Sequence, residues 1–392
     1  MPCREFKKNQ HAVFGKSVRA LYAHVPFCQA KCRYCDFYSV PIEPRQAEGY
    51  VRAASAELAG SGDLLALPLS SVFVGGGTPT VLGAAELQRL LGLVTPMIDD
   101  DTEFTLEANP GTLDAPMAAN LADLGVNRIS IGVQSFHDRE LRILGRAHGS
   151  REAHRSVALA RAAGIANVNV DLIYGIPGQT PASWTESVKT ALDLEITHLS
   201  CYGLSFEAET PLGEDLRRGR TAELDEAIQE KMYRAAGQLA RDRGMEHYEI
   251  SNFALPGHAC SHNLATWRNE PYVGIGPGAA SYVGGVRRCN APDLESYISA
   301  APAGRLSPAF QEELTGKARM AEALMLGLRI IQGVDRKDFA RRFGADPVRA
   351  FDRSVARHRR LGSLVVAPGR LRLAEEALFV SDTVLADILA EA

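Results

Sequence analysis

The chain has 392 residues, a formal net charge of −4, and 46% hydrophobic and 23% charged residues. This length suggests two or three domains of a globular protein, and the bulk charge gives no reason to expect a nucleic-acid partner. No apolar run approaches the roughly 18 residues of a membrane span, and residues 1–16 lack the apolar stretch of a secretory signal.

Six short β-branched runs predict strands, and Ala- and Leu-rich runs with helical spacing separate them. The predicted strands are Ala20–Val25, Ser71–Val74, Glu103–Glu107, Arg128–Val133, Val168–Ile173 and His198–Leu204. The predicted helices are Gln46–Ala59, Ala84–Leu93, Met117–Leu124, Arg151–Ala163 and Ser183–Leu192. The alternation predicts βαβ units and a parallel sheet, closed into a barrel or open and curved.

The alternation ends near Asp225. The elements predicted beyond it are a helix at Glu223–Arg243, a strand at Glu246–Ile250, a Gly-rich segment at Tyr272–Gly285, helices at Lys317–Ile331 and Asp346–Leu361, strands at Leu364–Ala367 and Leu371–Leu373, and a last helix. Helices followed by a small hairpin predict a winged-helix-like C-terminal domain. We therefore divide the chain into an N-terminal segment (1–19), a barrel (20–222), a barrel extension (223–310) and a C-terminal domain (311–392).

Polar residues follow several predicted strands at their carboxyl ends. They are Gly75–Thr80, Glu107–Pro110, Gln134, Asp171 and Ser205. In parallel α/β folds this edge of the sheet carries the active site. The sequence therefore predicts a site there.

Three of the seven cysteines, Cys28, Cys32 and Cys35, lie within eight residues directly after the first strand. An odd, clustered set is a poor disulfide framework and a good metal site, which predicts a reducing cytoplasm. Thiolates suit iron–sulfur clusters and zinc. A four-iron cluster held by three cysteines keeps one iron open for a ligand. The alternative is a structural zinc site with His24 or His262 as fourth ligand.

The C-x3-C-x2-C loop after the first strand resembles the signature of the radical S-adenosylmethionine (SAM) superfamily. Other segments are similar to its coproporphyrinogen-oxidase-like branch: Gly75–Thr80, Glu107–Pro110, Ile131–Phe136, Gly145–His148 and Asp171–Gln179. The resemblance runs from about Tyr22 to the C-terminus. It implies a partial (β/α)6 barrel, a [4Fe-4S] cluster on the three cysteines, and SAM bound to the open iron and cleaved to a 5′-deoxyadenosyl radical.

The resemblance also implies which residues contact SAM. They are Tyr22, Tyr34, Gly76, Gly77, Thr78, Glu107, Gln134, Arg146 and Asp171, and Ser205 and Ala280 match more loosely. The glycines allow close backbone approach, and the planar fork of an arginine suits a carboxylate. For any one of these residues alone, a surface or structural role is the alternative.

Two members of this branch are to be separated, the oxygen-independent coproporphyrinogen III oxidase and the HemW-type haem chaperone. The oxidase motif has a further cysteine two residues after the third, where this chain has Phe37. The oxidase also has a longer segment before the cluster, whereas the first strand here begins near residue 20. Both differences favour the chaperone type.

The segment Cys260–Trp267 is similar to the chaperone pattern H-N-x-x-[Y/F]-W, with Thr266 in place of the aromatic residue. The resemblance implies that His262 and Trp267 contact haem, because histidine is a usual axial ligand of haem iron and an aromatic ring packs on a porphyrin. Cys260 is an alternative ligand. A buried structural histidine is the alternative for His262.

The sequence thus favours a haem chaperone that delivers haem to respiratory haem proteins. A true coproporphyrinogen III oxidase is the second hypothesis, and a radical SAM enzyme with an unrelated substrate is the third. The expected location is the cytoplasm. The electron donor, a homodimer and attachment to a membrane surface are left open.

Overall fold

The computed structural model describes residues 18–392. The predicted N-terminal segment 1–19, with Cys3, therefore lies almost entirely outside the described residues.

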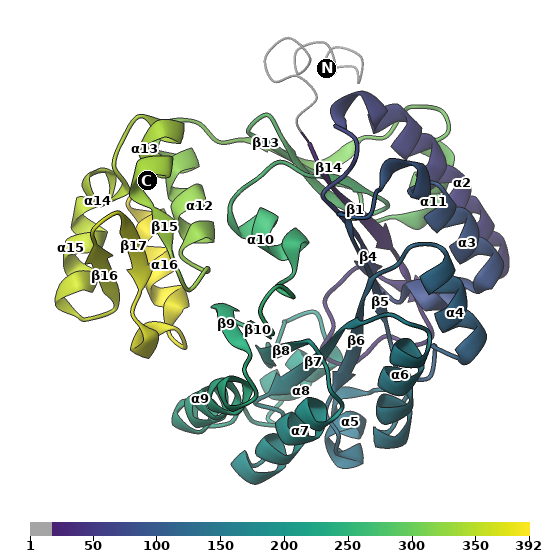
Figure 1. Ribbon diagram of the computed structural model, residues 1–392, viewed down its shortest axis with the longest axis horizontal. Coiled ribbons are helices and arrows are strands. Elements are labelled where there is room, and N and C mark those ends of the chain that lie inside the picture. The colour runs from purple at the N-terminus through teal and green to yellow at the C-terminus, as the bar shows by residue number, and fades with distance from the viewer. Residues whose placement is uncertain (1–17) are drawn as a thin grey trace.

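The core is a curved nine-stranded sheet with helices on its convex face (Figure 1). Six strands run parallel in chain order: β1 (Ala20–Val25), β4 (Ser71–Gly76), β5 (Glu103–Ala108), β6 (Arg128–Gln134), β7 (Asn167–Tyr174) and β8 (His198–Gly203). The helices between them are α2 (Pro44–Ser61), α3 (Ala84–Gly92), α4 (Ala115–Asp123), α6 (Ser150–Ala162) and α7 (Pro181–Asp193). The predicted α/β partial barrel is confirmed.

Local sequence accounts for where the helices begin. Asp114 caps α4 by accepting from the backbone N–H of Met117 at 2.8 Å, and Thr180 caps α7 by accepting from that of Ser183 at 3.1 Å. Both helices also carry proline in their first turn, where no intrahelical N–H is needed. These caps fix the helices that follow the site loops.

Further strands extend the sheet at both edges. β11 (Val273–Ile275) lies parallel to β1, while β10 (Asn252–Ala254) and β9 (Glu246–Glu249) continue antiparallel beyond β8. A separate antiparallel sheet contains β12 (Ala280–Val283), β13 (Val286–Asn290) and β14 (Pro308–Glu313). Also present are β2 (Phe27–Cys28), β3 (Val40–Pro41), α5 (Asp138–Leu144), α8 (Pro211–Arg217), α9 (Glu226–Asp242), α10 (Ser261–Trp267) and α11 (Leu294–Ala300).

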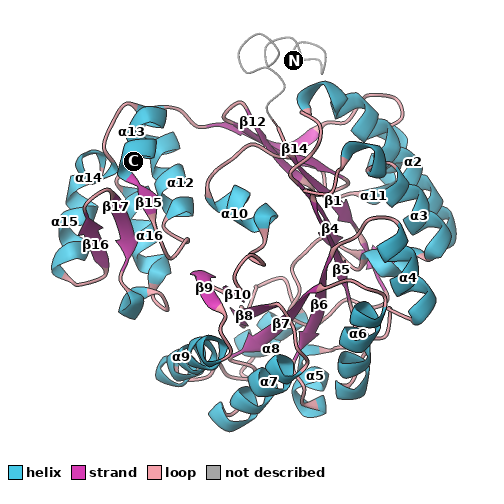
Figure 2. Cartoon of the chain, in the orientation of Figure 1, coloured by secondary structure: helices cyan, strands magenta, loops and turns pink. Residues whose placement is uncertain are grey.

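The C-terminal unit combines helices with a three-stranded antiparallel sheet, as in a winged-helix-like unit (Figure 2). It contains α12 (Gly316–Gly327), β15 (Val334–Asp335), α13 (Arg336–Phe343), α14 (Pro347–Ala350), α15 (Asp352–Arg360), β16 (Leu364–Ala367), β17 (Arg370–Leu373) and α16 (Ser381–Ala390). The single helix predicted over 346–361 is broken at Phe351, a buried residue whose φ and ψ of −123° and 48° are not helical.

Within residues 18–392, no helix has both the length and the apolar character needed to span a bilayer. The division at residues 222 and 310 stays a prediction.

Candidate functional site

The carboxyl ends of the parallel strands and the cysteine loop enclose a cavity of about 510 Å³. All three clustered cysteines line it. So do seven of the residues predicted to contact SAM: Tyr34, Gly76, Gly77, Glu107, Gln134, Arg146 and Asp171. The structure thus brings together most of the predicted site at the expected edge of the sheet.

The cysteine loop turns back on itself beside the cavity. The N–H of Cys35 donates to the carbonyl of Cys32 at 3.3 Å, and the N–H of Arg33 donates to the carbonyl of Leu144 at 3.0 Å. Burial raises the pKa of Cys35 to about 11, and the neighbouring thiols contribute in the same direction. Three such thiols ionise together only when cations compensate their charge, and the irons of a cluster supply that charge.

The two histidines considered as a fourth zinc ligand are engaged elsewhere. His24 contacts the Tyr22 hydroxyl at 3.0 Å and the carbonyl of Tyr38 at 2.9 Å. His262 contacts the hydroxyl of Ser71 at 3.1 Å. Among residues 18–392, no three His, Cys, Asp or Glu side chains are arranged to hold a single metal ion. Three thiols that face one cavity are the donor set that the predicted cluster with one open iron needs.

A chain of polar contacts links two of the three neighbouring cysteines, Cys32 and Cys28. Arg146 Nη1 lies 3.2 Å from Cys32 Sγ, and its Nη2 donates to Asn109 Oδ1. Asn109 Nδ2 donates to Thr78 Oγ1 at 2.6 Å, and this hydroxyl lies 3.7 Å from Cys28 Sγ. Thr78 thus faces the cysteine loop beside the main cavity.

The glycine run at the end of β4 permits close approach that no other residue allows. A Cβ on Gly75 would lie 2.7 Å from the Glu107 carboxylate, and one on Gly77 would lie 2.4 Å from the carbonyl oxygen of Phe27. The N–H of Gly76 donates to Glu107 Oε2 at 3.0 Å. The run therefore forms a backbone cradle next to the cysteine loop.

Two carboxyl groups, Glu107 of β5 and Asp171 of β7, line the cavity on either side of β6. Burial, together with the charge of Asp171, raises the pKa of Glu107 to about 7. Burial also raises the pKa of Asp171, which accepts from Ser130 Oγ at 3.0 Å and Asn169 Nδ2 at 2.8 Å. Carboxyl groups in such positions suit hydrogen bonding to ribose hydroxyls of a nucleoside.

We expect the pKa of Glu107 to appear in the pH dependence of stability. Between pH 4.5, the ordinary pKa, and pH about 7, folded Glu107 keeps a proton that the unfolded chain releases. Stability present below this interval is therefore lost as the pH rises through it. Glu107→Gln keeps an oxygen that accepts from Gly76 but does not titrate. Over this pH interval its unfolding free energy should therefore fall by on the order of 2 kcal/mol less than that of wild type. Urea unfolding at several pH values measures this, and parallel profiles would contradict it.

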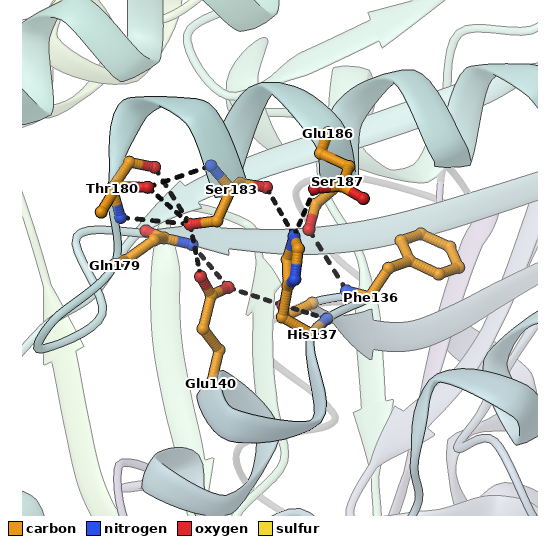
Figure 3. A network of polar contacts seen from close by, with 9 residues as sticks. Phe136, His137, Glu140, Gln179, Thr180, Ser183, Glu186 and Ser187 are labelled. Carbon is orange, nitrogen blue, oxygen red and sulfur yellow. Dashed lines mark hydrogen bonds and ion pairs between the residues drawn. The ribbon is translucent and has the colours of Figure 1, made fainter.

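Several motif residues hold the loops rather than line the cavity (Figure 3). Glu140 accepts from Ser135 Oγ at 2.6 Å, Gln179 Nε2 at 3.0 Å and Ser183 Oγ at 2.7 Å. The N–H of Phe136 donates to Ser187 Oγ at 3.3 Å. This network joins the loop after β6 to the start of α7, and so fixes the strand ends that carry the predicted SAM residues.

Two predicted SAM residues have distinct placements. Tyr22 lies inside the barrel, with its ring centroid 6.3 Å from that of His262, and does not line the cavity. Gln134 does line it, and has a φ of 68°, a left-handed conformation that costs a non-glycine residue free energy. Such strain at the end of a strand is a common mark of a functional position.

The helix α10 carries the predicted haem residues and lies on the concave side of the sheet (Figure 2). The Glu103 carboxylate accepts from the N–H groups of Ser261 and His262 at 2.9 and 3.1 Å. The His262 ring is buried, and burial with the nearby Arg128 lowers its pKa to about 4. Trp267 lies at the other end of α10.

Trp267 lines a second cavity of about 460 Å³ beside the C-terminal unit. The guanidinium carbon of Arg329 lies 4.4 Å from the Trp267 ring centroid. The buried indole nitrogen has no hydrogen-bond partner among the described residues. The structure thus does not bring His262 and Trp267 to one cavity.

A hydrogen-bonded chain connects Asp171 to α10. Asn169 donates to Asp171, its oxygen lies 2.6 Å from His198 Nδ1, and His198 Nε2 lies 2.8 Å from the Tyr248 hydroxyl. The Tyr248 oxygen accepts from the N–H of Cys260 at 3.3 Å. Because burial lowers the pKa of His198, the ring is neutral and can donate at one nitrogen while accepting at the other. A continuous run of hydrogen bonds therefore connects Asp171, at the predicted SAM edge, with the start of α10.

Sequence reasoning missed several residues that line the main cavity: Asn109, Arg128, Ser130, Asn169 and Asn263. Asn109 belongs to the Glu107–Pro110 motif, whose position after a strand was a usable signal. Arg128 begins a strand, and no pattern distinguishes it from a surface arginine.

Comparison with known proteins defines the class. Residues 22–191 match the radical SAM superfamily, and residues 314–380 match the HemN C-terminal domain. The fold is similar to that of the Escherichia coli coproporphyrinogen III oxidase HemN, with a TM-score of 0.82 over 97% of this chain and 93% of that one, at 21% identity. The chain is a radical SAM protein.

Relatives with higher identity narrow the class. The chain is 35% identical to Heme chaperone HemW of Bacillus subtilis over 83% of this chain and 87% of the relative. It is 34% identical to that of Mycobacterium tuberculosis over 91% and 93%, respectively. The chain belongs to the HemW family.

Proposed function

We propose that this chain is a haem chaperone, which binds haem and passes it to respiratory haem proteins. The observation that carries the proposal is the 35% identity to a protein named Heme chaperone HemW over 87% of that relative. Phe37 supports it, because this side chain, 64% exposed at the cavity, replaces the additional cysteine of the oxidase motif. The cytoplasm is the proposed location, with recipients at a membrane surface.

In this proposal Cys28, Cys32 and Cys35 hold a [4Fe-4S] cluster, as membership of the radical SAM superfamily implies. When bound, cluster and SAM together supply a radical by one-electron cleavage of SAM. Arg146 places positive charge against Cys32 Sγ, which stabilises a thiolate there. Glu107 holds its position through the N–H of Gly76 and offers its other oxygen to a ligand.

The proposal assigns the haem iron to His262, on the similarity of Cys260–Trp267 to the chaperone pattern. A neutral imidazole is the form that binds iron, and the lowered pKa of about 4 keeps His262 neutral. The ring now contacts Ser71 inside the barrel. Ligation therefore requires α10 to turn so that the ring leaves Ser71.

An anaerobic haem titration followed by absorbance tests this assignment. We expect wild-type protein and the control His258→Ala, altered just before α10, to develop the spectrum of bound haem. His262→Ala should lose or shift that spectrum, because the axial ligand is removed. An unchanged spectrum in His262→Ala would remove this residue from the site, and a wild type that binds no haem would refute the chaperone proposal.

Coproporphyrinogen III oxidation is a second candidate, because the motifs of this chain are shared with the branch that contains the oxidase. The fold also matches that of an oxidase over 97% of this chain, but at 21% identity this likeness supports the fold alone. Reconstituted protein that decarboxylates coproporphyrinogen III at many turnovers would favour this candidate. Cleavage of SAM stimulated only by another metabolite would favour an unrelated radical SAM reaction.

A further inference from the structure

Arg128 lies at the floor of the main cavity. It is the first residue of β6, is only 2% exposed and lines the cavity. Gly132 follows Arg128 by four residues, or about 13 Å along the strand. The carbonyl of Gly132 accepts from Arg146. The two arginines therefore lie at different depths of the same barrel.

The guanidinium of Arg128 has no hydrogen-bond or ion-pair partner in residues 18–392, and its Nε is buried without one. The surrounding carboxylates are engaged with other groups. Glu103 accepts from the N-terminus of α10, and Glu107 accepts from Gly76. Asp171 accepts from Ser130 of β6 and from Asn169 of its own strand. No carboxylate of the described chain lies within ion-pair distance of this arginine, although burial is opposed by the charges of Glu103 and Asp171, which raise its pKa.

A buried guanidinium normally has direct hydrogen-bond or ion-pair contacts, because leaving its N–H groups without them costs free energy. We propose that Arg128 binds a carboxylate of the ligand that enters the barrel cavity. This inference rests on the proposed function, under which the ligand is haem and the carboxylate is one of its propionates. Arg128 would then act as the anchor of the cargo at the cavity floor.

The surroundings favour a singly charged, planar anion. The arginine fork matches a carboxylate through two parallel hydrogen bonds. Glu107 and Asp171 line the same cavity, and whichever of them is ionised would repel a phosphate dianion more strongly than a carboxylate. A propionate also has a short flexible arm that reaches a buried floor while the ring system stays above it.

The position of Arg128 also connects with α10. Asn263 of α10 lines the same cavity as Arg128. Burial and then the charge of Arg128 lower the pKa values of both His262 and His198, in agreement with this shared lining. A carboxylate at Arg128 would therefore lie beside the residue assigned to the iron.

The test compares haem with its dimethyl ester, in which both propionates are masked, on cluster- and SAM-loaded protein. We expect Arg128→Gln to weaken haem binding about 10- to 100-fold, because a charge-assisted contact is lost. The ester should bind wild type about as weakly as haem binds the variant, and the variant should bind both alike. Arg128→Lys should recover part of the affinity, and Arg89→Gln, on the outer surface, should leave it unchanged.

The outcomes separate this inference from the proposed function. Wild type that binds haem and its ester equally overturns the role of Arg128 while leaving haem binding intact, and this arm needs no variant to fold. Arg128→Gln that keeps its cluster absorbance and binds haem like wild type overturns it as well. Wild type that binds neither compound refutes the chaperone proposal itself. SAM binding is measured in parallel, and a loss confined to SAM would assign Arg128 to SAM instead.

Discussion

Replacing Cys32 by alanine should give a folded chain that no longer holds a [4Fe-4S] cluster. Cys32 is partly exposed at the cavity, so its loss removes little buried surface. Two remaining thiols provide only half of the usual four ligands of a cubane. Arg146 would also lose the sulfur that its Nη1 faces at 3.2 Å. After anaerobic reconstitution, iron should fall from about four atoms per chain to less than about one.

The matched control is Cys289→Ala. Cys289 lies in β13, outside the barrel site, and its Sγ contacts the carbonyl of Gly278. This variant should keep its iron and its absorbance. Equal iron content in Cys32→Ala and wild type, with iron bound tightly through desalting, would contradict the cluster assignment.

Gly77→Ala should destabilise the fold strongly. The new Cβ would lie 2.4 Å from the carbonyl oxygen of Phe27, a rigid backbone atom that also accepts from the N–H of Thr78 at 2.7 Å. One of these segments must move, and Phe27 is fully buried. We expect a loss of about 2–3 kcal/mol in unfolding free energy, in the range of overpacked sites. Because Phe27 directly precedes Cys28, cluster loading should fall too.

Gly92→Ala serves as the control for this change. Gly92 ends α3, and nothing lies within 4 Å of its added Cβ. Alanine there should leave stability unchanged or raise it by up to about 1 kcal/mol. Denaturant unfolding and iron analysis of the two variants decide the matter. Equal stability and equal iron in Gly77→Ala and wild type would show that the cradle tolerates a side chain.

Most of the barrel could be predicted because its strands carry strong local signals. Ala20–Val25 agrees with β1 at both ends, and the other five parallel strands were placed to within a few residues. Buried parallel strands are continuous β-branched runs, and helices with caps separate them. Local propensity and burial thus favour the same structure throughout this half of the chain.

The remaining elements depend on contacts distant in sequence. Val273–Ile275 is a three-residue run with glycine at its centre, and only its pairing with β1 makes it the strand β11. Arg336–Phe343 forms α13, although its sequence is highly charged and its apolar face is small. Neither element has a periodic signal long enough to predict alone.

In the candidate site, too, the sequence predicts the motif residues but not the contacts that form between distant segments. Motif matching found the residues at strand ends, such as Glu107 and Asp171, because family patterns place them there. It did not find Arg128, because an arginine at the start of a strand has no local mark of burial. Nor could it foresee that His262 would contact Ser71, nearly two hundred residues away in sequence. These facts follow from the packing of α10 inside the barrel.

The most direct test of haem delivery is a transfer measurement. Haem-loaded protein, with cluster and SAM in place, is mixed with a haem-free respiratory protein in membranes, and the haem content and activity of the recipient are followed. The chaperone account predicts that haem leaves this chain and restores the recipient faster than the same amount of free haem. Haem that stays bound to this chain, or a recipient restored no faster than by free haem, would contradict it.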